Sequence, residues 1–225
     1  MRLVQGMPSA SRCLLRDQFR SYKETSDAGG IVVASTISNG ISPTGASGRV
    51  TYNGTEALLI NATQATFVLR FKMFSVNNPA VTKSLIAKAP QALNDNQFFM
   101  QIEPNRLLNT IVCATAGDFA NGAYLSAALV LGAEYVMHIV YNGALAAASR
   151  VLYYIAGAFS GTASYGTTPA SMRVSAVPLT ILNRHLAAAA APDDLLLREF
   201  RVHDRAFSAE EVADDYANIT YSEVL

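Results

Sequence analysis

Short runs of alternating apolar and polar residues, separated by turn signals, constrain the fold of this chain more than any other feature. Apolar residues recur at every second position in three of these runs, 67–73, 98–102 and 135–141. This period places one face of a strand in a core and the other face outside it. Asn-Gly pairs, which favour tight turns, begin at positions 39, 53, 121 and 142. Many short strands with frequent turns predict an all-β, two-sheet antiparallel sandwich.

The chain ends in a strand-like run followed by signals for one short helix. Ser208 is a favoured N-cap residue, and Glu211 stands at the capping-box spacing three positions later. Phe207 and Val212 occupy the two positions of a hydrophobic staple. Acidic residues lie near the positive end of the helix dipole, and we expect them on its exposed face: Glu210, Glu211, Asp214 and Asp215. The sequence therefore predicts a short C-terminal α-helix.

Five segments, taken in their linear order, resemble the laminin-G-like type of concanavalin A-like sandwich. The segment Tyr-Val-Met-His-Ile-Val-Tyr-Asn-Gly at 135–143 is similar to the family's central strand and turn. The segment Asp-Arg-Ala-Phe-Ser-Ala-Glu-Glu-Val at 204–212 is similar to its closing segment. Three further strands of the family resemble 65–72, 151–157 and 178–182. The resemblance spans roughly residues 50–220 and implies a jelly-roll of the concanavalin A-like lectin/glucanase superfamily.

The chain departs from that family pattern in two ways. It contains no Trp, and Ala156 stands where the family has an Asp or Asn in a turn. The family usually works outside the cytoplasm, at cell surfaces or in secreted proteins. The resemblance therefore implies a protein that acts through its surface.

Length and composition bound the domain organisation. A chain of 225 residues suits one sandwich core. Residues 1–30 are mildly basic, and we predict for them either an N-terminal arm that reaches a neighbouring subunit or the first strand. Residues 31–225 are predicted to form the concanavalin A-like, laminin-G-like domain. Two alanine runs, 144–148 and 187–191, are too short for stable helices alone, and a loop is predicted for the second.

Charge and hydropathy argue against two classes of partner. Charged residues make up only 15% of the chain, and 17 basic residues oppose 17 acidic ones. This balance offers no basic surface, so we expect no nucleic-acid binding. No apolar run is long enough to span a bilayer, so we expect no membrane insertion. The N-terminus also lacks the apolar core of a signal peptide, and we therefore interpret the Asn-x-Thr sequences at Asn53, Asn61 and Asn218 as chance matches.

The cysteines and histidines show no zinc-site spacing. Cys13 and Cys113 lie a hundred residues apart, and we favour two thiols over a disulfide, which the sequence leaves open. We interpret each of the three histidines as a structural or surface residue: His138, His185 and His203. We predict neither a metal site nor a cofactor.

Carboxylates and serines show no catalytic motif either. The Glu-x-Asp-x-x-Glu strand of retaining hydrolases in the superfamily is missing, as is a Gly-x-Ser-x-Gly elbow. Calcium is the remaining possibility, with loop candidates at Asp95, Asp118, Asp193, Asp194 and the triplet 94–96. Asn and Asp are also ordinary turn residues, and that interpretation is favoured. We predict that the protein has no catalytic residues and is not an enzyme.

The main functional prediction is a non-enzymatic structural or adhesive accessory protein on a phage virion. Phage proteins released by lysis need no secretion signal, and the low charge suits capsid decoration or attachment to a tail. The expected partners are virion structural proteins and further copies of the same chain, at the virion surface. This prediction rests partly on fold analogy.

The alternative is an extracellular, lectin-like carbohydrate-binding module that reaches cell-surface glycans. Tyrosines near loops or strand ends could form an aromatic platform: Tyr124, Tyr153, Tyr154 and Tyr165. The ligand-binding residues stay unassigned. A glycan-degrading enzyme is the third hypothesis, and the missing acid motif counts against it.

Overall fold

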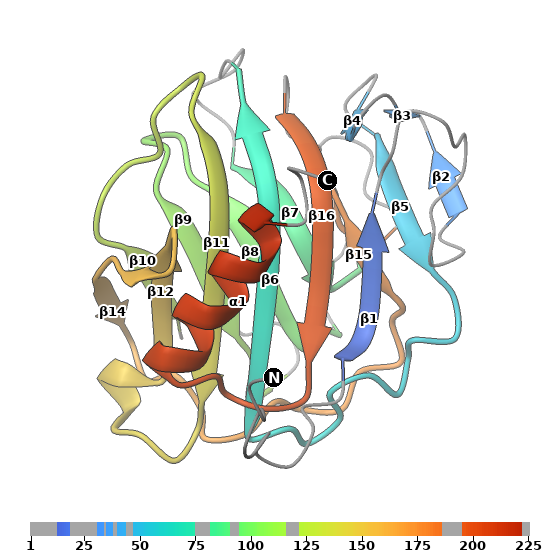
Figure 1. The fold of residues 1–225 in the computed structure, drawn as a ribbon. Helices are drawn as coiled ribbons and strands as arrows, with labels where there is room; N and C mark the ends of the chain where they lie inside the picture. The colour runs from blue at the N-terminus through green and yellow to red at the C-terminus, as the bar shows by residue number, and fades with distance from the viewer. Residues whose placement is uncertain are drawn as a thin grey trace, which may run out of the picture.

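A computed structural model of the chain describes residues 13–18, 31–33, 35–37, 40–43, 47–74, 82–90, 95–115, 122–185 and 195–221. These residues form two antiparallel sheets packed face to face, and one α-helix lies against the outside of the first sheet (Figure 1). The predicted all-β, two-sheet sandwich with a short C-terminal helix is thereby confirmed.

The first sheet, called sheet A, has eight strands in the described part of the chain. Their order is β13-β12-β11-β6-β16-β4-β3, and β1 also pairs with β16. The longest of them, β6, runs antiparallel to both β11 and β16 and forms the centre of the sheet. The strands are β1 (Cys13–Gln18), β3 (Ser35–Ile37), β4 (Ile41–Pro43), β6 (Gln64–Met73), β11 (Glu134–Asn142), β12 (Val151–Ile155), β13 (Ala158–Phe159) and β16 (Leu195–His203).

The second sheet, called sheet B, lies behind sheet A in Figure 1 and also has eight described strands. Their order is β14-β10-β9-β8-β7-β15-β5-β2. Four strands that are consecutive in the chain, β7 to β10, pair as a meander, so residues close in sequence become lateral neighbours. The strands are β2 (Ile31–Val33), β5 (Arg49–Tyr52), β7 (Lys83–Lys88), β8 (Phe98–Ile102), β9 (Leu108–Val112), β10 (Gly122–Leu125), β14 (Thr162–Tyr165) and β15 (Leu179–Ile181).

The main core fills the space between the two sheets. Phe67, Leu69 and Phe71 of β6 point into it from sheet A, and Phe98 and Met100 of β8 meet them from sheet B. The rings of Phe67 and Phe98 lie 4.9 Å apart, centroid to centroid, which joins the two layers directly. Burial of each such side chain contributes about 1.5–3 kcal/mol. The alternation predicted for all three runs is confirmed, because their apolar faces share this core.

The C-terminal helix α1 (Ala209–Tyr221) crosses the outer face of sheet A in front of β11 and β6 (Figure 1). Its capping box is confirmed: the Ser208 amide donates to Glu211 Oε2 at 2.8 Å, and the Glu211 amide donates to Ser208 Oγ at 3.2 Å. Phe207 and Val212 join Val140 of β11 in a small apolar cluster that fixes the helix to the sheet. No helix in the described residues is long and apolar enough to cross a membrane.

Residues 13–18 of the predicted N-terminal arm form β1, which pairs with β16. Residues 1–12 and 19–30 lie outside the described residues, so the boundary at residue 30 stays a prediction. The first alanine run contains a short 3-10 helix, η1 (Ala147–Ser149), and the second run lies outside the described residues. Cys13 and Cys113 are both free thiols, as favoured from the sequence.

Candidate functional site

The outer face of sheet B carries polar side chains on three neighbouring strands. Gln101 of β8 pairs with Asn109 of β9, and Asn109 pairs with Tyr124 of β10. These side chains face away from the core, because the residues next to them in sequence, such as Met100 and Ala123, enter it. Gln101 and Tyr124 are partly exposed, whereas Asn109 is buried. We call Gln101, Glu103, Asn109 and Tyr124 the sheet B polar row.

Glu103 is the charged centre of the sheet B polar row. Its Oε1 accepts hydrogen bonds from Gln101 Nε2 at 2.8 Å and from Asn109 Nδ2 at 3.0 Å. Its Oε2 accepts a hydrogen bond from Thr82 Oγ1 at 2.8 Å. Hydrogen bonds to an ionised acceptor are roughly twice as strong as neutral ones, so the carboxylate fixes the orientation of both amides.

Tyr124 adds an aromatic ring and a hydroxyl donor to the row. Burial raises the pKa of the Tyr124 hydroxyl, and the negative charge of Glu103 raises it further. The hydroxyl therefore stays protonated at neutral pH. Planar amides, a carboxylate and a Tyr ring on one sheet face supply the polar contacts and the apolar surface that a sugar requires.

The four tyrosines named from the sequence do not form one platform. The Tyr153 hydroxyl lies in the core, 2.8 Å from Thr110 Oγ1 and 2.7 Å from the Ala123 carbonyl. Tyr154 lies on the opposite face of the molecule, under α1, in the same cluster as Val212. Tyr165 belongs to β14, and its backbone pairs with Gly122. Of the four, Tyr124 is the one that the structure places in the sheet B polar row.

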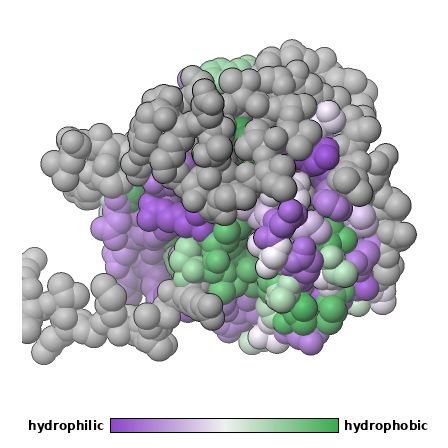
Figure 2. All heavy atoms as spheres, turned by 90° about the vertical axis from the view of Figure 1, so that its right-hand side faces the viewer, coloured by the Kyte–Doolittle hydropathy of each residue, from purple (hydrophilic) through white to green (hydrophobic). Residues whose placement is uncertain are grey.

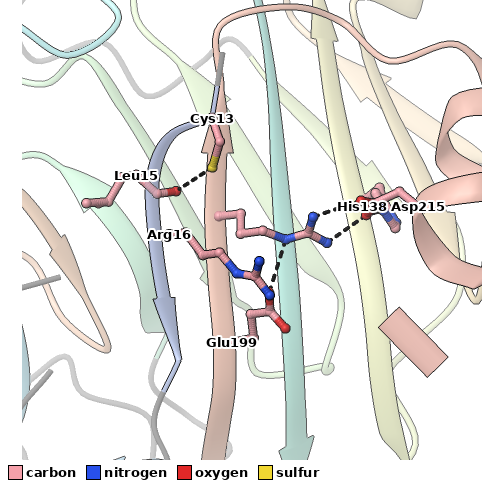
Figure 3. Close-up of polar contacts among 7 residues, drawn as sticks. Cys13, Leu15, Arg16, His138, Glu199 and Asp215 are labelled. Atoms are coloured by element: carbon pink, nitrogen blue, oxygen red, sulfur yellow. Dashed lines mark hydrogen bonds and ion pairs between the residues drawn. The ribbon is translucent and has the colours of Figure 1, made fainter. Parts of the chain in front are cut away.

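A second polar cluster lies under α1, where Asp215 reaches toward sheet A (Figure 3). Asp215 Oδ1 and Oδ2 accept hydrogen bonds from Arg201 Nη1 at 2.8 Å and Nη2 at 2.6 Å. His138 Nε2 lies 2.7 Å from the same Oδ2. Glu199 Oε1 lies 3.3 Å from Arg201 Nε and 3.1 Å from Arg16 Nη2. We call Arg16, His138, Glu199, Arg201 and Asp215 the helix-anchoring cluster.

The geometry of the helix-anchoring cluster fits a structural role. Burial raises the pKa of Asp215, but hydrogen bonds from His138 and Arg201 outweigh it and hold that pKa well below its usual range. The His138 side chain is completely buried between the sheet and the helix, so it offers no surface to a substrate. Partial burial raises the pKa of the nearby Cys13 thiol, although Arg201 opposes this, so a reactive thiolate is not favoured.

Asp215 corrects one expectation drawn from the sequence. It faces the sheet, whereas Glu210 and Asp214 are exposed as expected. Glu211 caps the helix and also forms an ion pair with Arg205, with 2.6 Å between Oε2 and Nη1. Helical spacing offered a signal, since Asp215 stands three residues after Val212, which faces the sheet.

The other two histidines lie in different surroundings. His203, on β16, packs its ring 4.7 Å from the ring of Phe207, centroid to centroid. Burial, followed by the charge of Arg201, lowers the pKa of His203 to about 4. His185 forms a backbone bridge with Pro90, and burial lowers its pKa as well. Both rings are therefore neutral at pH 7.

The calcium candidates are only partly described. The Asp95 carboxylate accepts hydrogen bonds from Arg173 Nη1 at 2.8 Å and from the Ala176 amide at 3.1 Å, which accounts for this residue without a metal. Asp118, Asp193, Asp194 and Asn94 lie outside the described residues. Among the residues that are described, no group of three or more His, Cys, Asp or Glu side chains could hold a metal ion. The absence of a metal site stays a prediction.

An open groove of about 550 Å³ lies at the edge of the sandwich, between β1 and the turns at 54–62. Figure 2 faces this edge and shows hydrophobic surface beside hydrophilic surface. Leu14, Leu58 and Ile60 contribute to the apolar walls, and Asp204 contributes the charge. The described residues that line the groove include no aromatic side chain, so it suits a sugar less well than the sheet B polar row does.

Comparison with known proteins identifies the fold. No protein-family model matches the chain, and no curated protein sequence matches it. Among solved structures, Trypanosoma rangeli sialidase in complex with sialic acid superposes with a TM-score of 0.62 at 11% identity, over 89% of this chain and 32% of the sialidase. The receptor-binding domain of botulinum neurotoxin C/D mosaic serotype superposes with a TM-score of 0.62 at 12% identity, over 92% of this chain and 51% of that one.

A third structure comes with the description that cell entry of botulinum neurotoxin type C depends on interaction with two ganglioside molecules. It has a TM-score of 0.61 at 12% identity, over 92% of this chain and 51% of the toxin chain. This chain thus spans about a third of the sialidase and half of the toxin chains. At such low identity the similarity concerns the fold, a β-sandwich compatible with the concanavalin A-like class.

The comparison also corrects a prediction. We predicted from the sequence that the protein is not an enzyme, and this prediction is wrong as an exclusion: the same sandwich occurs in chains of a sialidase, so the fold does not exclude an enzyme. The prediction relied on the missing Glu-x-Asp-x-x-Glu motif. That motif tests for one carboxylate-pair mechanism, so its absence does not exclude other mechanisms. In its fold, the chain is similar to β-sandwiches found in a sialidase and in a toxin receptor-binding domain.

Proposed function

We propose that this protein is a lectin-like carbohydrate-binding module with a laminin-G-like sandwich, and that it binds glycans through the sheet B polar row. One observation carries the proposal. The Glu103 carboxylate orients the amides of Gln101 and Asn109 on the same sheet face that presents Tyr124. Sugar hydroxyls donate and accept hydrogen bonds, and such a set of fixed polar groups beside an aromatic ring is complementary to them.

The structural neighbours support the same proposal. One is described in complex with sialic acid, and another by its interaction with ganglioside molecules, so the neighbouring folds include glycan-binding proteins. Jelly-roll sandwiches recur in lectin domains. Because this chain spans only part of each neighbour, the proposal concerns binding by the sandwich itself, at cell-surface or extracellular glycans.

An array of immobilised oligosaccharides tests the proposal. We expect the protein to bind a subset of glycans, and Tyr124→Ala to weaken that binding at least tenfold, the loss expected when about 1.4 kcal/mol of stacking and hydrogen bonding is removed. Phe159→Ala is the matched control, because Phe159 is 58% exposed but lies on sheet A. Equal losses in both variants, or no binding to any glycan, would contradict the proposal.

The virion setting and the homo-oligomer remain proposals that rest on the sequence alone. Light scattering after size exclusion measures the oligomeric state. A deletion that tests the N-terminal residues should stop at residue 12, because β1 begins at Cys13 and pairs with β16. An oligomer that dissociates on deletion of residues 1–12 would support an assembling arm. A monomer with and without these residues would contradict it.

A further inference from the structure

We infer that the sheet B polar row selects neutral, hydroxyl-bearing saccharides over anionic ones such as sialylated glycans. The inference rests on the proposed function and names the class of ligand that the same face accepts. It starts from the position of Glu103, whose carboxylate contacts both amides of the row and the Thr82 hydroxyl.

The amides of the row are directed toward Glu103 and not toward a ligand carboxylate. Gln101 and Asn109 each donate an N–H to Glu103 Oε1. An anionic ligand needs donors or cations that can turn to meet it, and these two donors are oriented by an anion already in place. The row therefore presents a fixed negative charge to a ligand, beside the Tyr124 hydroxyl.

The negative charge of the site also favours neutral ligands. The charged group that acts on the Tyr124 hydroxyl is Glu103, and its effect on the pKa of Tyr124 is that of a negative neighbour. A second carboxylate brought within about 4–6 Å of Glu103 would be repelled. A neutral sugar hydroxyl can instead donate to Glu103 in a charge-assisted hydrogen bond. The same residue thus favours one class of ligand and disfavours the other.

This selectivity differs from what fold similarity alone would suggest. Two of the neighbours are described with sialic acid or with gangliosides. The residues of the sheet B polar row argue for neutral ligands although the overall fold is shared, because specificity depends on the groups at the site.

The test uses an array in which each neutral oligosaccharide is printed beside a counterpart with one added carboxylate, either a terminal sialic acid or a uronic acid in place of a hexose. We expect the protein to prefer the neutral member at least about fivefold, the factor for two like charges about 4 Å apart in water. We expect Glu103→Gln to bring the two members of each pair within about twofold, because it removes the charge and keeps the side-chain length.

Glu210→Gln is the matched control, since Glu210 is an exposed carboxylate on α1. It should leave the preference unchanged. Thermal unfolding of each variant shows whether the fold is retained. Binding of the anionic members as strongly as the neutral ones, or an unchanged preference in Glu103→Gln, would overturn the inference while the proposed function stands. Binding to no saccharide at all would overturn both.

Discussion

Asp215 and Arg201 form a two-pronged ion pair between the C-terminal helix and the sheet beneath it, with N–O distances of 2.8 and 2.6 Å. His138 completes the site at 2.7 Å from Asp215 Oδ2. The pair joins residues of α1 and β16, and His138 adds β11. This carboxylate therefore holds the helix on sheet A together with the apolar cluster around Val212.

Replacement of that carboxylate should destabilise the protein. We expect Asp215→Asn to lower the free energy of unfolding by about 3 kcal/mol, because it removes the two-pronged charged partner of the Arg201 guanidinium, which is 8% exposed, and leaves only Glu199 beside it. Urea unfolding measures the loss. Asp214→Asn is the control, since Asp214 is exposed on the same helix, and it should change stability by less than about 0.5 kcal/mol. Equal effects of the two substitutions would show that the pair is not stabilising.

Stability should fall as the pH decreases from about 6.5 to 4. Burial lowers the pKa of His203 to about 4, so the unfolded chain binds more protons than the folded chain in this window. The free energy of unfolding therefore rises with pH across it, by roughly 3 kcal/mol at most for His203, with a smaller addition from His185. Urea unfolding at a series of pH values measures the slope, which His203→Gln should reduce. A flat profile in the wild type would contradict the account.

Asp215 also makes the free energy of unfolding fall as the pH decreases, but it does so in a lower pH range. Its folded pKa lies well below its usual range, so the stability that it contributes is present above the unfolded pKa of about 3.9 and is lost below it. Asp215→Asn should therefore reduce the pH dependence below about pH 4, while His203→Gln reduces it above that value. The same urea series measures both slopes. If both substitutions reduced the slope in the same pH range, the assignment of one range to each residue would be wrong.

Ala156 should be replaceable with a gain in stability. Ala156 and Gly157 connect β12 and β13 in a two-residue turn, with φ values of 50° and 79°. A left-handed conformation strains Ala, whereas Asn-Gly is the favoured pair in such turns. We expect Ala156→Asn to raise the free energy of unfolding by about 0.5–1 kcal/mol. In thermal unfolding, Ala158→Asn, an exposed change in the adjoining strand, should give no gain. An equal gain at both positions would argue against turn strain as the cause.

Gly143 should tolerate no side chain. A Cβ at this position would lie 1.8 Å from the Ala170 carbonyl oxygen, so the two chain segments would have to separate. We expect Gly143→Ala to cost at least about 2 kcal/mol in urea unfolding. Gly54→Ala is the control, because nothing lies within 4 Å of a Cβ there and only the positive φ is unfavourable. A smaller loss at Gly143 than at Gly54 would contradict this reading of the close approach.

Much of the fold could be predicted because its signals are local. The period of two in β6, β8 and β11 identified the buried faces, and the residues from Phe207 to Val212 identified the start of α1. The contacts of Asp215 could not be predicted, because they depend on which strands α1 covers. The sequence contains only the spacing from Val212 to Asp215, which places both on one side of a helix.

The sheet B polar row shows more clearly that contacts between separate strands could not be predicted from the sequence. Alternation along β8 places Gln101 and Glu103 on one face, which the sequence reveals. Their approach to Asn109 and Tyr124 depends on the pairing of β8 with β9 and of β9 with β10, and a shift of one residue would turn those side chains into the core. The Tyr124 ring could therefore be named from the sequence as a sugar contact, whereas its polar neighbours could not.

The most direct test of the account is a titration of isotope-labelled protein with a neutral oligosaccharide that binds on the array, followed by backbone amide chemical shifts. We expect the largest shifts in β8, β9 and β10, around Gln101, Asn109 and Tyr124, and we expect Tyr124→Ala to require at least about tenfold more ligand for the same shifts. Shifts confined to the groove beside β1 or to the surface of α1, with the sheet B polar row unchanged, would contradict it.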